Sequence, residues 1–139
     1  MDQNKVLKGN KGKVWLNGKL LSGIKSIEAK VTLNFEEVNV CDENGTFNVY
    51  TGWSGEGSVT MTKTDNTVLK LMKDCAKTGI MPEIKIITSL TDVSTGKSER
   101  VAIYNIVINE FMLTKFEAKA INEEEIPFKF SSYDVLETI

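Results

Sequence analysis

Apolar and polar residues alternate along most of the chain, and this pattern is typical of β-strands that bury one face. The clearest run is 26–35, where five apolar residues alternate with five polar ones. Ten residues at the usual rise span about 33 Å. We therefore expect a long strand over 26–35 with one face on a core. Further alternating or β-branched runs predict strands over 59–64, 84–90, 101–109, 111–121 and 126–130.

Short polar segments between these runs predict turns. Asn17-Gly18 lies between two apolar runs, and both central residues of a type I′ hairpin turn need a positive φ angle, which Asn and Gly tolerate. A tight hairpin is therefore expected at 14–21. Two further turns are predicted at 42–45 and 92–97, which are rich in Asp, Asn, Ser and Gly.

One segment, 65–77, has helical spacing, because its apolar residues fall on one face. This stripe should pack on a sheet of the same subunit, and it consists of Val68, Leu71, Met72, Cys75 and Ala76. Thr64 or Asp65 is placed to cap the first turn, and Gly79 to end the helix in a left-handed conformation. Cys75 is expected to act as a small core residue rather than as a reactive thiol.

These elements make six or seven strands and one helix in 139 residues, which is the size of one ordinary domain. We expect a single domain with a mainly β fold, an antiparallel β-sandwich or barrel with one flanking α-helix. The polar, lysine-rich residues 1–12 are expected to form a flexible N-terminal arm. No apolar run approaches the roughly 20 residues of a membrane-spanning helix, so we expect neither secretion nor a membrane partner.

Charge and residue content narrow the function. Seventeen Lys and Arg residues against nineteen Asp and Glu residues give a net charge of −2, which argues against nucleic acid as the main partner. The chain has no histidine, the commonest general base and metal ligand, and Cys41 and Cys75 match no zinc or redox spacing. Residues 1–30 carry a net charge of +5 and residues 110–139 carry −4. These blocks are either solvated surface or a source of attraction between copies of the chain.

Several short motifs resemble ligand-binding loops but lack a required part. The segment 95–98 resembles the end of a phosphate-binding loop, but Thr91 stands where a glycine is needed and a strand follows instead of a helix. The glycine-rich run 52–57 has the wrong spacing for a dinucleotide. A calcium loop over 42–53 would need Glu at its last position, where Trp53 stands. We therefore expect no cofactor, no metal site and no enzymatic activity.

A set of short motifs runs in a fixed order along nearly the whole chain. They are Gly12–Lys19 (GKVWLNGK), Glu28–Lys30 (EAK), Glu36–Val38 (EEV), Thr51–Ser58 (TGWSGEGS), Lys77–Gly79 (KTG), Ile126–Phe130 (IPFKF) and Asp134–Glu137 (DVLE). In this combination the chain resembles the tail tube (core tail) proteins of contractile phage tails, of the type found in the PBSX prophage of Gram-positive bacteria. It is also similar to the tube subunits of phage-tail-like bacteriocins.

The resemblance implies a structural protein that self-assembles. Subunits of such tubes form hexameric rings that stack into a hollow tube, and strands of neighbouring subunits join in a continuous β-barrel around the lumen. The implied partners are the chain itself and the tail sheath, tape-measure and baseplate proteins, with DNA only as passing cargo in a phage. The implied location is a virion tail or tail-like particle whose parts are made in the bacterial cytoplasm.

Two other functions also fit the sequence. A monomeric β-barrel would bind a small ligand or a carbohydrate through aromatic residues on one exposed face. The candidates Trp15, Tyr50 and Trp53 do not share one predicted strand. A secretion-system tube would have a fold similar to that of a tail tube and would differ in its neighbouring genes.

The segment 36–58, between two patterned strands, is expected to be a long loop that contacts another subunit. It is about twice the length of an ordinary hairpin loop or more, and its apolar residues have no obvious place in one small sandwich. Its glycines would let the backbone bend or approach another chain closely, with Trp53 as the anchor. The alternative is an extra hairpin on the subunit's own core. The candidate self-assembly residues are Val40, Phe47, Val49, Tyr50, Gly52, Trp53, Gly55 and Gly57.

Overall fold

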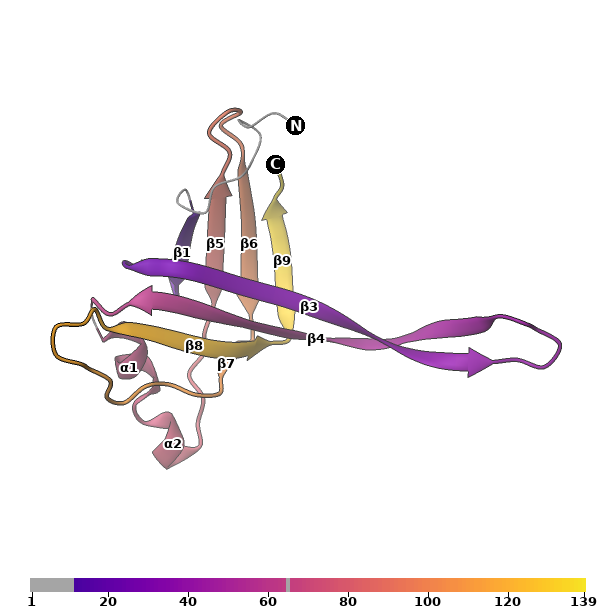
Figure 1. The fold of residues 1–139 in the computed structure, drawn as a ribbon, viewed down its shortest axis with the longest axis horizontal. Helices are drawn as coiled ribbons and strands as arrows, with labels where there is room; N and C mark the ends of the chain where they lie inside the picture. Colours follow the sequence, from indigo (N-terminus) through magenta and orange to yellow (C-terminus); the bar gives the residue numbers. More distant parts are fainter. Residues whose placement is uncertain (1–11, 65) are drawn as a thin grey trace.

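Residues 12–64 and 66–139 are described in a computed structural model, and they form two packed antiparallel sheets (Figure 1). The arm expected at 1–12 lies outside the described residues except for Gly12, which begins the first strand. In the first sheet the strand order is β2-β1-β5-β6-β9. Its strands are β1 (Gly12–Leu16), β2 (Lys19–Leu20), β5 (Ile86–Thr91), β6 (Ser98–Tyr104) and β9 (Ser132–Glu137). The mainly β fold expected from the alternation is confirmed.

The second sheet has the order β3-β4-β8-β7, and its strands run across those of the first sheet (Figure 1). Its strands are β3 (Ile24–Asn39), β4 (Thr46–Thr62), β7 (Val107–Ile108) and β8 (Glu123–Phe130). β3 and β4 pair along nearly their whole length, whereas β8 pairs only with the 55–62 part of β4. The rest of the β3–β4 hairpin extends away from the body of the molecule (Figure 1).

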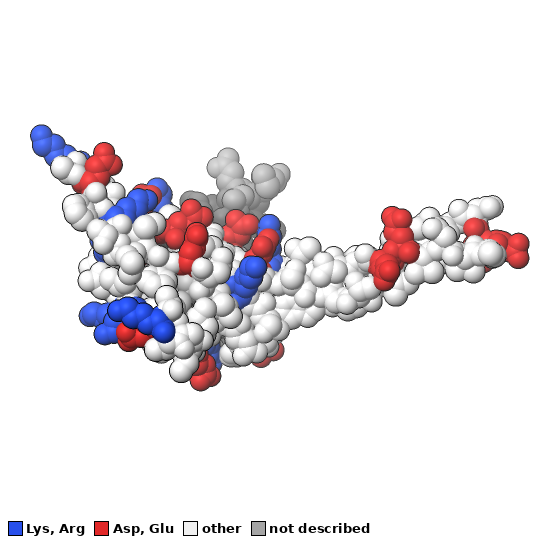
Figure 2. Space-filling view, turned by 90° about the horizontal axis from the view of Figure 1, so that it is seen from below, with Lys and Arg blue, Asp and Glu red and all other residues white. Residues whose placement is uncertain are grey.

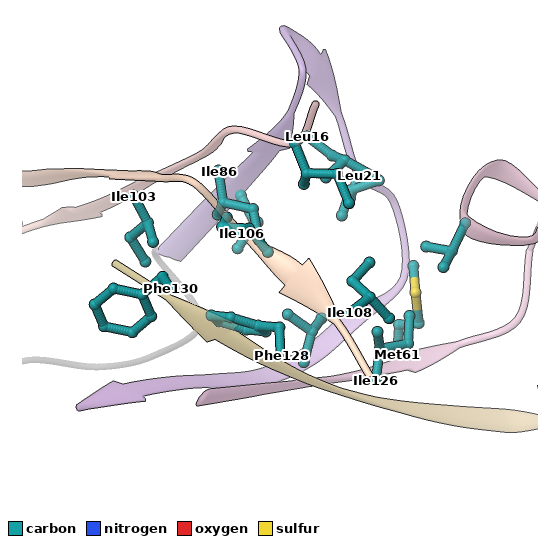
Figure 3. Close-up of a cluster of buried hydrophobic side chains, with 14 of the residues drawn as sticks. Leu16, Leu21, Met61, Ile86, Ile103, Ile106, Ile108, Ile126, Phe128 and Phe130 are labelled. Carbon is teal, nitrogen blue, oxygen red and sulfur yellow. The ribbon is translucent and has the colours of Figure 1, made fainter. Parts of the chain in front are cut away.

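The core lies between the two sheets, where alternate residues of each strand point inward (Figure 3). Ile86 and Ile103 enter it from the first sheet, and Ile126 and Phe128 enter it from the second. Only 2 % of the surface of Phe128 is exposed to solvent. Burial of these apolar side chains is the main force that holds the two sheets together.

The predicted turns are confirmed. Asn17 and Gly18 both have positive φ angles, 50° and 86°, as a type I′ turn requires, and they join β1 to β2. The 42–45 turn joins β3 to β4, and the 92–97 turn joins β5 to β6. In the last of these the Gly96 N–H donates a hydrogen bond to the Asp92 carbonyl oxygen.

The helix expected over 65–77 is instead two short helices, α1 (Thr67–Met72) and α2 (Cys75–Thr78). They separate at Asp74, a residue type whose side chain competes with the backbone for hydrogen bonds. The expected cap by residue 64 or 65 is wrong, since Asn66 occupies the N-cap position without a side-chain hydrogen bond.

The apolar stripe of this region packs on the subunit's own core, as expected. Val68 and Met72 are buried in the core cluster, while Leu71 and Cys75 pack at its margin and Ala76 is exposed. Gly79 ends α2 with a φ angle of 71°, and its N–H donates to the Cys75 carbonyl oxygen, which confirms the predicted left-handed stop.

The strand predicted over 111–121 is wrong. β7 pairs with the last residues of β8, and the chain then leaves the sheet and returns irregularly to the start of β8. A strand needs a partner for its backbone groups, and this segment has none within the second sheet. Phe111 alone packs against the core, and Leu113 and Phe116 are exposed.

Candidate assembly surface

The segment expected as a long loop, 36–58, is largely regular strand, and this corrects the expected interruption of the sheet. Its outer half pairs in register across the hairpin, with Phe35 opposite Tyr50 and Val38 opposite Phe47. Only 40–45 forms the connection, because the strand pairing continues to Asn39 and resumes at Thr46. We call residues 34–52 the outer hairpin.

An irregularity separates the outer hairpin from the sheet. The register shifts by one residue at Thr51, whose hydroxyl donates a 3.1 Å hydrogen bond to the Asn34 carbonyl oxygen, and Gly52 follows with a φ angle of 139°. Such bulges increase the twist of a strand pair, and Figure 1 shows β3 and β4 crossing each other in the projecting part of the hairpin. The apolar side chains of β3 also change face near this irregularity, because Leu33 and Val38 point to opposite faces of the strand.

Large apolar side chains on the outer hairpin and on the adjacent part of β3 are exposed to solvent, with between 37 % and 56 % of their surface accessible. They are Val31, Leu33, Phe35, Val38, Val40, Phe47, Val49 and Tyr50. The rings of Phe35 and Tyr50 contact each other edge to face, 6.0 Å between centroids. Soluble monomers rarely expose this many large apolar groups on one segment, so the hairpin is a candidate interaction surface.

The structure gathers the expected residues Val40, Phe47, Val49 and Tyr50 on the outer hairpin. Sequence analysis did not include Val31, Leu33, Phe35 and Val38 among the candidate residues, although Val38 lies in the segment 36–58 that was expected to contact another subunit. The first three were expected to face a core, but the second sheet extends beyond the first and these side chains are exposed among residues 12–64 and 66–139. A predicted strand of about 33 Å in a small sandwich was the signal that part of it would project.

The other candidates lie in the body of the subunit, with Gly52 at the boundary. Trp53 is half-buried, and its ring contacts Phe130 and Tyr133 at centroid distances of 6.1 and 5.5 Å. The glycines Gly55 and Gly57 lie beneath phenylalanine rings of β8. The groups that approach these glycines closely thus belong to the same subunit. Trp53 packs the base of the outer hairpin against β8 and β9.

Charge on the outer hairpin has a single sign. Glu36, Glu37, Asp42 and Glu43 lie on it, and the chain has no Lys or Arg between residues 31 and 62. Figure 2 shows only acidic side chains along the projecting part, whereas lysines gather on the body. The partner of this surface should therefore combine apolar and basic groups.

The terminal charge blocks pair partly within one subunit. Lys25 of the basic block forms a 2.9 Å ion pair with Glu123 of the acidic block. Glu124 of the acidic block also forms a less exposed pair at 3.5 Å with Lys63, which lies outside the basic block. Attraction between the blocks therefore acts at least partly inside the chain rather than between copies.

Of the motifs that resembled ligand loops, 95–98 spans the end of the 92–97 turn and the start of β6, 42–45 lies in the connection between β3 and β4, and 52–57 is strand within β4. Hydrogen bonds from the hydroxyl and N–H of Ser94, and from the hydroxyl of Thr95, lower the pKa of the Asp92 carboxyl and close the 92–97 turn. Within 12–64 and 66–139, no group of three or more Cys, Asp or Glu residues is placed to hold a metal ion. In the same residues, no helix has the length and apolarity to cross a membrane.

Comparison with known proteins identifies the kind of assembly. The family model described as phage tail tube protein matches residues 1–137. The phage-like element PBSX protein XkdM of Bacillus subtilis is 32 % identical over 136 residues, which cover 96 % of this chain and 92 % of that protein.

Solved tubes share the fold at low sequence identity. In the PVC sheath-tube complex of an extracellular contractile injection system, a chain matches with a TM-score of 0.77 and 11 % identity, over 96 % of this chain and 93 % of that one. The SPP1 tail tube matches with a TM-score of 0.68 and 14 % identity, over 96 % of this chain and 81 % of that one. The chain therefore belongs to the phage tail tube protein family, as a structural subunit of a tail tube.

Proposed function

We propose that the subunit assembles into hexameric rings that stack into the inner tube of a contractile phage tail or phage-tail-like bacteriocin, and that its outer hairpin contacts a neighbouring subunit. The observation that carries the proposal is the projection of this hairpin, with its exposed apolar residues, beyond the body of the subunit. Burial of that surface against another copy would remove it from water and favour association.

The edges of the second sheet support the same proposal. β3 is an edge strand 16 residues long, and β7 at the opposite edge has only two residues. A long exposed edge offers unpaired N–H and C=O groups to another chain. Joining the second sheets of neighbouring subunits into one barrel around the lumen would satisfy these groups.

The remaining partners follow from the place of a tube in a tail. A sheath surrounds it, a tape-measure protein sets its length from within, and a baseplate ends it. A net charge of −2 suits a channel through which DNA passes as cargo without binding. The subunit would be made in the bacterial cytoplasm and built into the particle there.

Removing the outer hairpin tests the proposal. Because Phe35 and Tyr50 lie directly opposite, residues 36–49 can be replaced by Asn-Gly, which closes a shorter hairpin in the same register. We expect a soluble, folded subunit that forms no tubes in negative-stain micrographs, whereas the parent chain forms tubes of uniform width. A parent that stays monomeric would favour a binding module instead.

Two point variants keep the fold of the hairpin and sharpen this test. Phe47→Ser combined with Val49→Ser should reduce assembly strongly, whereas Val93→Ser, an exposed apolar residue of the 92–97 turn, should not. Normal tubes from the shortened chain would refute the role of the hairpin. A shortened chain that cannot fold would show that the hairpin belongs to the subunit's own core.

A further inference from the structure

The two short helices carry a basic surface on the side away from the core. Lys70 lies in α1, Lys73 directly follows α1 and Lys77 lies in α2, whereas Val68 and Met72 of α1 are buried in the core. All three lysines are exposed. The chain that follows α2 adds two exposed apolar side chains, Ile80 at 74 % and Met81 at 45 %. We call Lys70, Lys73, Lys77, Ile80 and Met81 the basic face.

The outer hairpin is complementary to the basic face in both charge and polarity. It presents four carboxylates and no cation, and its apolar pair Val38–Phe47 lies beside Val49 on one face of the strand pair. The two surfaces lie at opposite ends of the molecule, so the outer hairpin cannot reach the basic face of its own subunit (Figure 1). Figure 2 shows acidic side chains on the projecting hairpin and lysines at the far end of the body.

We infer that the outer hairpin of one copy binds the basic face of the next copy. The inference rests on the proposed role of the hairpin in assembly and adds the surface that receives it. A contact between two different surfaces of one chain is head-to-tail, and repetition of such a contact generates a closed ring or an open helical stack. One interface of this kind is therefore enough to extend an assembly through many copies.

Apolar and charged groups have different tasks in this contact. Val38, Phe47 and Val49 would bury area against Ile80 and Met81, which supplies most of the attraction. Exposed ion pairs are individually weak, but several acidic residues opposite three lysines select the partner surface and its orientation. Glu36 shares the face of Val38 and Phe47, and Asp42 and Glu43 lie in the connection at the end of the hairpin. Such pairs are screened over about 10 Å at 0.1 M salt and about 3 Å at 1 M, so the contact should weaken as salt is added.

Charge reversal on each side tests the inference. The first variant carries Glu36→Lys, Glu37→Lys, Asp42→Lys and Glu43→Lys, and the second carries Lys70→Glu, Lys73→Glu and Lys77→Glu. Each variant alone would oppose like charges, so we expect at least a tenfold lower assembled fraction in sedimentation. In an equal mixture, a reversed hairpin meets a reversed basic face, and an unchanged hairpin meets an unchanged face. We therefore expect the mixture to form tubes in which the two variants alternate.

Controls separate this contact from other effects of charge and fold. Circular dichroism and melting temperature confirm that both variants fold, and Lys13→Glu with Lys97→Glu reverses two exposed lysines outside α1 and α2 without loss of assembly. Rescue only in the mixture supports the inference. Assembly by either variant alone, or a mixture that stays dispersed, would overturn it. If the shortened hairpin still abolishes tubes in that case, the hairpin acts in assembly but binds elsewhere.

Discussion

The ring of Phe130 lies over Gly55, its cross-strand partner in β4. A Cβ atom built on Gly55 would come within 2.4 Å of that ring. Gly57 lies in the same way under Phe128, and its Cβ would also meet the Glu28 carbonyl oxygen at 2.3 Å. The two glycines thus leave the room in which both rings pack, with exposures of 2 % for Phe128 and 7 % for Phe130. This contact joins the base of the hairpin to the core.

Alanine at either glycine should destabilise the subunit. We expect Gly55→Ala to cost about 1–3 kcal/mol, as overpacking of a core usually does, and Gly57→Ala to cost more because a backbone oxygen cannot rotate away. Gly45→Ala in the hairpin connection is the matched control, since no heavy atom lies within 4 Å of its Cβ position. Urea unfolding measures all three, and equal stability of Gly57→Ala and the parent would contradict the packing described here.

Met72 should contribute more to stability than its neighbour Leu71. Met72 is fully buried in the core cluster, whereas Leu71 packs only at the margin. Met72→Ala is expected to lower the free energy of unfolding by about 2–5 kcal/mol, and Leu71→Ala by less. Ala76→Ser, at an exposed position of α2, serves as the control. If Leu71→Ala proved the more damaging change in thermal unfolding, the assignment of the buried face would be wrong.

Asn17 joins the first hairpin to the segment that leads into β5. Its side-chain amide donates a 3.1 Å hydrogen bond to the Glu83 carbonyl oxygen, and its side-chain oxygen accepts a 2.8 Å bond from the Lys85 N–H. Asn17→Gly keeps the positive φ angle but loses both bonds, at about 0.5–1.5 kcal/mol each. Asn17→Ala adds backbone strain of about 1 kcal/mol or more. Denaturant titration should therefore rank stability as parent, glycine variant, alanine variant, and the reverse order of the two variants would contradict this account.

Elements that depend on neighbouring residues could be predicted from the sequence. The Asn17-Gly18 turn, the 92–97 turn and the stop at Gly79 each follow from a preference of the backbone for particular φ angles at those residues. The alternation of strands likewise depends only on adjacent positions. The mainly β fold class was therefore accessible without any knowledge of how the strands pair.

What covers a strand could not be predicted, because it depends on distant parts of the chain. Alternation in 26–35 shows that one face is apolar, but Ile27 packs on the core while Leu33 and Phe35 are exposed beyond it. Gly55 and Gly57 are similar cases. A glycine in a strand indicates that another group approaches the backbone closely. Only the register with β8 shows that the groups that approach these two glycines belong to the same subunit.

Acid should weaken the 92–97 turn through Asp92. Three hydrogen bonds to its carboxylate lower its pKa in the folded subunit below the value of about 3.9 expected for the unfolded chain. A depressed carboxyl pKa stabilises the fold above the unfolded pKa, and that stabilisation is lost as the pH falls toward the folded pKa. The Asp92→Asn variant has no ionisable carboxyl at this position. The difference in unfolding free energy between the parent and this variant should therefore be largest near pH 7 and should shrink below about pH 4. Thr95→Val removes one of the three donors and should keep most of the pH dependence. Urea unfolding at pH 7, 4 and 3 measures these differences, and a deficit that is the same at pH 3 as at pH 7 would show that the carboxylate charge contributes nothing to the turn.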